Sequence, residues 1–167
     1  IPGSLSVLTG KSLGISDGTS LGAAINTLPG VSMQSGTYTT NRIVIRGMGS
    51  RTPYNTNRIR SYLNDIPLTS YDGISTPEEI DLQSIGRLEL VKGPSSALYG
   101  SGLGGSLNLY TLSDTDDRYH TGLLYGAYNT VRLGASALLH GRNSNFMGSV
   151  NRMQSDGYRE NNRYGRT

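Results

Sequence analysis

Glycine is the feature that most constrains how this chain can fold, because it occupies 23 of the 167 positions. That share is roughly double the usual ~7% of globular proteins. Glycine destabilises helix interiors and permits tight turns and close approaches of the backbone. The glycines follow no three-residue period, which excludes a collagen-like triple helix. The sequence therefore predicts short elements joined by many turns.

The rest of the composition excludes several classes of protein. The absence of cysteine rules out disulfides, thiolate catalysis and cysteine-bound zinc. No apolar run approaches the ~20 residues that a membrane-spanning helix needs. The net charge of +3 comes from scattered Lys and Arg, so nothing supports a nucleic-acid-binding surface. No signal peptide is recognisable, so we expect either a cytoplasmic protein or one whose leader has been removed.

Residues 1–112 alternate between short predicted strands and short predicted helices. Ser20 is predicted to cap a helix that Pro29-Gly30 ends. The apolar residues of this helix share one face and are Leu21, Ala24, Ile25 and Leu28. Strands are predicted at residues 5–8, 31–33, 42–46, 61–66, 87–92 and 106–111, and a helical turn at residues 94–99.

A second helix is predicted to begin at Thr76 and to end near Ile85. Thr76 and Glu79 have the spacing of a capping box, and Pro77 stands at the first helical position. Together these elements predict a small α+β domain over residues 1–112, with a small mixed sheet and short helices.

The pattern changes after a charged linker at residues 113–117. Two stretches of about ten residues alternate between apolar and polar positions and join near Asn129-Thr130, and a third strand is predicted at residues 145–153. Such segments are typical of transmembrane β-strands. A soluble antiparallel sheet would give the same alternation. The sequence therefore predicts about three antiparallel strands in residues 113–167 and leaves their environment open.

No set of residues suggests catalysis, a cofactor or a metal. Gly100, Gly102 and Gly105 match a dinucleotide-binding spacing, but a helical turn precedes them and a strand follows, the reverse of the required order. His120 and His140 have no carboxylate nearby at ligand spacing. Asn64-Asp65 and Asp72-Gly73 have the composition of turns. We therefore expect a protein that is not an enzyme.

Two polar loops are the best candidates for binding a ligand, residues 47–60 and residues 70–77. Guanidinium groups bind carboxylates and phosphates with two hydrogen bonds, and tyrosines add hydrogen bonds and stacking. This chemistry suits an anionic ligand such as a ferric–carboxylate chelate. The alternative is that the arginines pair with acidic residues elsewhere in the fold. The candidate ligand-binding residues are Arg51, Tyr54, Asn57, Arg58 and Tyr71, with Arg60 and Asp72 close by.

Several segments resemble, in the same order, the TonB-dependent receptors of the outer membrane of Gram-negative bacteria. The longest is Ile85-Gly86-Arg87-Leu88-Glu89-Leu90-Val91-Lys92-Gly93-Pro94-Ser95-Ser96-Ala97-Leu98-Tyr99-Gly100, which continues through residues 104–109. The others are residues 1–9, Leu28-Pro29-Gly30-Val31, Ile43-Val44-Ile45-Arg46-Gly47, and Ser155-Asp156-Gly157-Tyr158-Arg159-Glu160-Asn161.

The resemblance implies a plug domain, residues 1–112, inside the lumen of a β-barrel that residues 113–167 only begin. It also implies energy-coupled import of a scarce nutrient, with the TonB–ExbB–ExbD complex and outer-membrane lipid as partners. A siderophore or ferric citrate-like iron chelate is the expected ligand. Cobalamin, haem and oligosaccharides remain alternatives, as does a signalling transducer of the same fold. A rival from another class is a secreted β-rich carbohydrate-binding or adhesion module.

The resemblance also assigns a plug–barrel lock to Arg46, Arg87 and Glu89, because the matching plug positions are thought to pair with charges of the barrel wall. Simple stabilisation of the fold is the alternative. The chain departs from the family in two respects. The turn at Asn64-Asp65 lacks the usual glycine, and no TonB box precedes Ile1. Since three strands cannot close a barrel, we expect a fragment of a longer protein.

Overall fold

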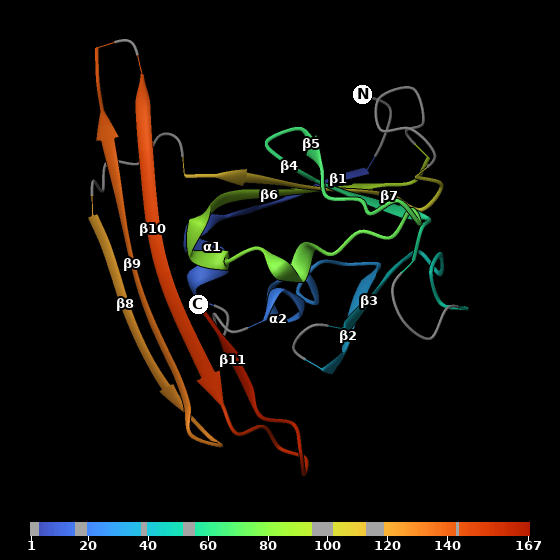
Figure 1. Ribbon diagram of the computed structural model, residues 1–167. Helices are drawn as coiled ribbons and strands as arrows, with labels where there is room; N and C mark the ends of the chain where they lie inside the picture. The colour runs from blue at the N-terminus through green and yellow to red at the C-terminus, as the bar shows by residue number, and fades with distance from the viewer. Residues whose placement is uncertain are drawn as a thin grey trace. The chain divides into compact units, whose positions relative to one another are not determined.

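The computed structural model describes residues 4–15, 20–37, 40–51, 56–94, 102–112, 119–142 and 144–167. These residues form two compact units, Ile1–Thr111 and Leu112–Thr167 (Figure 1). Within the described ranges, every helix is too short or too polar to cross a membrane. The predicted helical turn at residues 94–99 and the predicted linker at residues 113–117 lie almost entirely outside the described residues.

The first unit is built on a five-stranded mixed sheet in the order β1-β6-β7-β4-β5. Only β4 and β7 run parallel, and the other neighbours are antiparallel. Alternate residues of β6 and β7 point into the core, so that Leu88 pairs with Leu109 and Leu90 with Leu107. The strands are β1 (Ser4–Thr9), β4 (Ile59–Leu63), β5 (Ile66–Pro67), β6 (Ile85–Lys92) and β7 (Gly105–Thr111).

A second layer covers one face of this sheet and consists of short helices and a hairpin (Figure 1). The Ser20 hydroxyl accepts a hydrogen bond of 3.1 Å from the Gly22 amide and caps α2, which confirms the predicted start of this helix. Gly30 follows with φ +73°. The elements of this layer are α1 (Gly10–Ile15), α2 (Leu21–Ile25), β2 (Val31–Thr37) and β3 (Thr40–Ile45). Of these, α1 was not predicted from the sequence.

The glycine-rich run before β7 is explained by backbone packing. Gly105 has φ +135°, and a Cβ atom there would lie 2.1 Å from the carbonyl oxygen of Val91. Gly102 is also buried, and a Cβ there would lie 2.9 Å from the carbonyl oxygen of Gly105. Only glycine fits these positions, so the run allows β7 to approach β6 closely. Gly100 lies outside the described residues.

The helix predicted from Thr76 is wrong. The chain forms two separate 3-10 turns, η1 (Pro77–Glu79) and η2 (Leu82–Ser84), and the Thr76 side chain makes no capping hydrogen bond. Ile80 and Leu82 both pack against the core. An α-helix would point these two side chains about 200° apart, whereas the extended backbone at Ile80 lets both reach the core. Core packing therefore outweighs the local capping signal.

The strand predicted at residues 61–66 is interrupted. Asn64 (φ 47°) and Asp65 (φ 66°) form a tight hairpin turn between β4 and β5, with both residues in the left-handed region. Their side chains compensate for the missing glycine, because the Asn64 Oδ1 accepts from the Thr111 amide at 3.1 Å and the Asp65 Oδ1 from the Tyr110 hydroxyl at 3.2 Å. In addition, β4 begins at Ile59, so the preceding loop ends earlier than predicted.

The second unit is an open antiparallel sheet in the order β11-β10-β9-β8. Leu123 pairs with Leu133 on a face where both are exposed, by 74% and 51%, whereas Arg132 on the opposite face is buried. The strands are β8 (Tyr119–Gly126), β9 (Thr130–His140), β10 (Asn145–Ser155) and β11 (Tyr164–Arg166), the last of which was not predicted. Together the two units confirm the predicted fold class, a mixed sheet with short helices followed by antiparallel strands.

Candidate functional site

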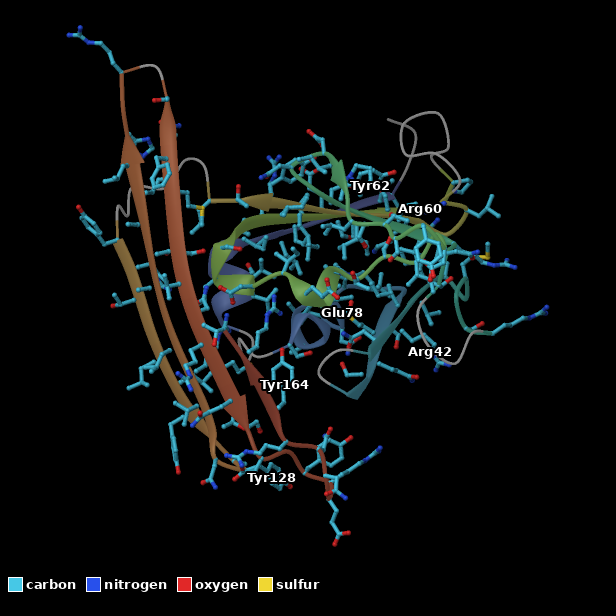
Figure 2. All side chains as sticks on the ribbon, in the orientation of Figure 1. Arg42, Arg60, Tyr62, Glu78, Tyr128 and Tyr164 are labelled. Carbon is cyan, nitrogen blue, oxygen red and sulfur yellow. The ribbon has the colours of Figure 1, made fainter. Side chains whose placement is uncertain are left out.

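The structure brings the two predicted ligand-binding loops together. The Arg60 Nη1 donates a hydrogen bond of 3.1 Å to the carbonyl oxygen of Gly73 (Figure 2). A Cβ atom at Gly73 would lie 3.4 Å from the Cβ of Asn57. The second loop is closed on itself, since the Asp72 Oδ1 accepts from the Ile74 amide at 3.1 Å. Arg60 and Asp72 therefore stabilise the conformation of the loops.

The other candidate residues of these loops face solvent. Arg51, Asn57, Arg58 and Tyr71 are exposed, and Tyr71 is fully so. Within the described part of the chain, neither Arg51 nor Arg58 has an ion-pair partner. These exposed guanidinium groups remain accessible to an anionic ligand. Tyr54 lies outside the described residues.

Two of the three residues assigned to the plug–barrel lock contact each other. The Arg87 Nε lies 3.2 Å from the Glu89 Oε1, and the Arg87 guanidinium lies 4.6 Å from the centre of the Tyr110 ring. Both side chains lie on the sheet face opposite the buried Leu88 and retain contact with solvent. A partly exposed pair of this kind contributes little to stability.

Arg46 lies elsewhere, at the Pro29-Gly30 turn. Its amide donates to the Gly30 carbonyl at 2.9 Å, and its backbone has φ 49°. The Lys92 ammonium donates to the Pro29 carbonyl at 2.7 Å, and Lys92 is only 6% exposed. The Arg46 backbone and the Lys92 ammonium therefore both contact this turn, at the far end of β6 from Arg87.

Lys92 was not predicted as a functional residue from the sequence, although a signal was present. Leu88, Leu90 and Lys92 are spaced by two residues, which places all three on the core face of one strand. A lysine at a core position needs a partner for its ammonium group, and a functional role could have been considered on that ground.

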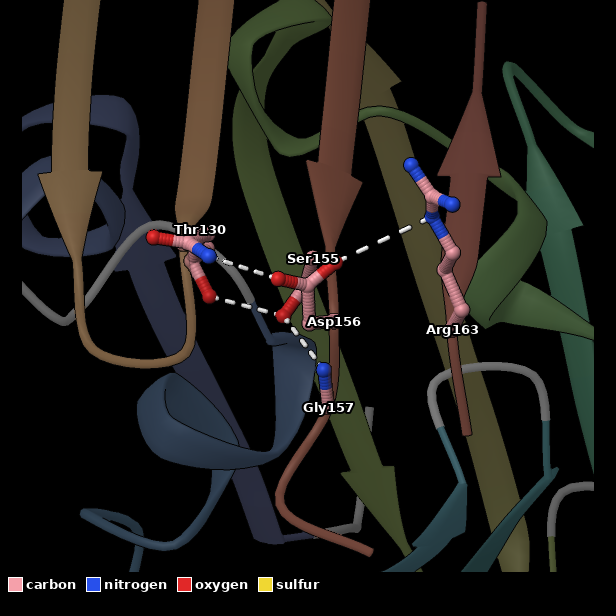
Figure 3. Close-up of polar contacts among 6 residues, drawn as sticks. Thr130, Ser155, Asp156, Gly157 and Arg163 are labelled. Carbon is pink, nitrogen blue, oxygen red and sulfur yellow. Dashed lines mark hydrogen bonds and ion pairs between the residues drawn. The ribbon is translucent and has the colours of Figure 1, made fainter. Parts of the chain in front are cut away.

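In the second unit, the segment that begins with Ser155-Asp156-Gly157 contacts the turn between β8 and β9 (Figure 3). The Asn129 Nδ2 donates to the Asp156 Oδ2 at 2.6 Å, and the Asp156 amide donates to the Tyr128 carbonyl at 2.9 Å. The hydroxyls of Thr130 and Ser155 lie 2.8 Å apart. Tyr128 and Asn129 both have positive φ. Ser155 and Asp156 thus hold the strained β8–β9 turn against the end of β10.

Nothing in the described ranges suggests a metal centre, because no three His, Asp or Glu side chains there come together at ligand distance.

Comparisons with known proteins agree with this architecture. Residues 1–106 match the family model of the TonB-dependent receptor plug domain. An iron-regulated outer membrane virulence protein of Vibrio cholerae is 34% identical over 116 residues, which are 68% of this chain and 18% of that protein. The chain therefore spans about a fifth of the length of this relative.

Solved structures show the same fold. The ferric yersiniabactin uptake receptor FyuA of Yersinia pestis superposes with a TM-score of 0.66 and 23% identity over 92% of this chain and 24% of that receptor. FpvA of P. aeruginosa, bound to a heterologous pyoverdine, superposes with a TM-score of 0.69 and 18% identity over 92% of this chain and 20% of that receptor. Because the plug-domain match covers well over half of its length, the chain belongs to the TonB-dependent receptors of the bacterial outer membrane.

Proposed function

We propose that this chain is part of a receptor that imports an iron chelate across the outer membrane, and that it transports its ligand without catalysis. The observation that carries the proposal is the pair of adjoining loops with exposed Arg51 and Arg58, whose charges suit an anionic chelate. The relatives add support, because one is named iron-regulated and another takes up ferric yersiniabactin.

In this proposal, residues 1–112 are the plug and residues 113–167 are the first strands of the barrel. The plug-domain match ends at residue 106, and the two compact units divide after Thr111. The second unit is an open sheet with an exposed apolar face, which suits strands that contact lipid. The remaining strands would come from the rest of a longer receptor, and the TonB–ExbB–ExbD complex would supply the energy.

We also propose that Arg46 locks the plug to acidic groups of the barrel wall. Arg46 is exposed at the Pro29-Gly30 turn, where the Lys92 ammonium adds a second positive charge. Arg87 and Glu89 remain part of the proposal, although their mutual contact already neutralises both charges.

The test is a titration of the full receptor with ferric siderophores, ferric citrate, haem and cobalamin. Arg51→Ala and Arg58→Ala are each expected to weaken binding of the iron chelate about tenfold, the effect of losing one charge-assisted hydrogen bond. Tyr54→Ala and Tyr71→Ala test the aromatic contribution. Arg159→Ala removes an exposed arginine from the second unit and should leave the affinity unchanged.

Unchanged affinity in both loop arginine variants would remove the loop assignment. Binding of cobalamin or haem in preference to every iron chelate would overturn the proposed ligand class while leaving the family membership intact.

A further inference from the structure

A small pocket lies at the base of the two loops, where both rejoin the core. Asn41 contributes to it from β3, Thr56 from the end of the first loop and Ser61 from β4. Ser75 contributes from the end of the second loop, and Glu78 from η1 (Figure 2). Residues from five separate segments therefore place polar side chains around one small space.

The polar lining of this pocket is buried. Asn41 and Thr56 are each 7% exposed, Ser75 is 8% exposed and Ser61 is 1% exposed. Ile43 and Ile59 complete the walls. Polar groups withdrawn from solvent to this extent are usually satisfied by hydrogen bonds, either within the protein or with an internal water molecule.

Two of the hydroxyl oxygens already accept hydrogen bonds from the backbone. The Ser75 Oγ accepts from the Ser61 amide at 3.0 Å and lies 3.1 Å from the Thr69 Oγ1. The Thr56 Oγ1 accepts from the Arg58 amide at 3.1 Å. The Ser61 Oγ differs, since it is buried and has no hydrogen-bond partner in the part of the chain that the structure describes.

The size and chemistry of the pocket select its occupant. The centre of a water-sized sphere has about 10 Å³ in which to move, which is room for one water molecule. Hydroxyls can donate to a water oxygen, and carboxylate or amide oxygens can accept from it. Glu78 is the only acidic residue among the described residues of the lining, whereas calcium sites gather several oxygen ligands and more negative charge.

Glu78 also benefits from a polar occupant. Burial raises the pKa of the Glu78 carboxyl above its usual value of 4.5, while hydrogen bonds from its own backbone and from the Asn41 side chain oppose that rise. A water molecule beside this carboxyl would restore part of the lost hydration.

We propose that this pocket binds one internal water molecule, which accepts a hydrogen bond from the Ser61 hydroxyl and links the bases of both loops to β4 and η1. The water is then a structural part of the region where both loops join β4 and η1, and its loss loosens both loops at once. This inference does not depend on the identity of the transported ligand.

The first test is a high-resolution crystal structure of the full receptor, with a second crystal soaked in rubidium chloride. We expect one density peak at hydrogen-bond distance from the Ser61 Oγ, without an anomalous rubidium signal. A rubidium signal at this position would identify a cation site and overturn the proposal. Absence of a peak, with the Ser61 hydroxyl turned toward a protein group, would also overturn it.

The second test compares Ser61→Ala with Ser32→Ala in the full receptor by amide hydrogen exchange. Ser32 is an exposed hydroxyl on β2 and serves as the matched control. Ser61→Ala should remove the density peak and speed exchange of amides in residues 56–58 and 73–75 by about 2- to 10-fold, as expected for the loss of one hydrogen-bonded bridge. Equal exchange in both variants would contradict the bridging role, even if the water itself is seen.

Discussion

Replacing Gly105 by alanine tests whether the close approach of β6 and β7 determines the stability of the first unit. The new Cβ would lie 2.1 Å from the Val91 carbonyl oxygen and 3.2 Å from the Val91 carbonyl carbon. Both are backbone atoms of the neighbouring strand, so a strand must move. Gly105 pairs with Lys92 on one side and Ile59 on the other, and this movement disrupts both pairings.

The expected loss can be estimated from two terms. The strained φ of +135° costs an alanine about 1–3 kcal/mol. Disrupting roughly two backbone hydrogen bonds costs about 1 kcal/mol each. The sum is about 3–5 kcal/mol, a large part of the ~5–15 kcal/mol by which domains are usually stable.

Gly47→Ala is the matched control, because Gly47 also has a positive φ, +83°, but a Cβ there would meet nothing within 4 Å. It should cost only about 1–2 kcal/mol of backbone strain. The assay is equilibrium urea unfolding followed by far-UV circular dichroism, with free energies obtained by linear extrapolation. Equal losses in the two variants would refute the steric argument, since strain alone would then account for both.

Three further predictions concern single side chains of the first unit. Ser20→Ala should lower the unfolding free energy by about 1 kcal/mol in urea titrations, because it removes the cap of α2; no change would mean that the cap is redundant. Asn108→Leu should raise the melting temperature, because both side-chain amide atoms are buried without partners among the described residues, an arrangement that costs about 1–3 kcal/mol; a lower melting temperature would contradict this expectation. Burial holds the pKa of Glu78 above 4.5 in the folded state, so the stability it contributes is present below the unfolded pKa and lost as the pH rises through the folded pKa. Thermal melts between pH 4 and pH 8 should therefore show the melting temperature of Glu78→Gln rising relative to that of the unsubstituted protein as the pH rises. A constant difference in melting temperature between the two proteins would contradict the raised pKa of Glu78.

The elements that the sequence predicted correctly are those specified by neighbouring residues. The start of the helix after Ser20 depends on a cap and an apolar stripe within nine residues, although the helix ends at Ile25, before the predicted stop at Pro29-Gly30. The alternation in residues 119–140 specifies two strands and their turn. The helix predicted from the capping signal at Thr76 does not form, because Ile80 and Leu82 both pack against core residues that are distant in the sequence. The pairing of β1 with β6 leaves no local signal, since it joins segments about 80 residues apart.

In the candidate site, too, the sequence predicts features that depend on neighbouring residues and misses those that depend on distant ones. The sequence identified both loops by composition, but only the fold shows that Arg60 reaches across to Gly73 and therefore acts structurally. Lys92 could have been found from the two-residue spacing of Leu88, Leu90 and Lys92, whereas its contact with the same turn as Arg46 depends on three segments meeting at Pro29-Gly30. The roles of Arg51, Asn57, Arg58 and Tyr71 remain predictions.

The order of strands in the first sheet has a consequence for biosynthesis. Ser4 is the first residue of β1 and pairs with Lys92, and β4 needs β7, which ends at Thr111. A ribosome adding ~5–20 residues per second takes roughly 5 to 20 s to make the ~100 residues between β1 and the end of β7. Throughout that interval at least one strand of the sheet is missing, so the nascent chain cannot complete this fold.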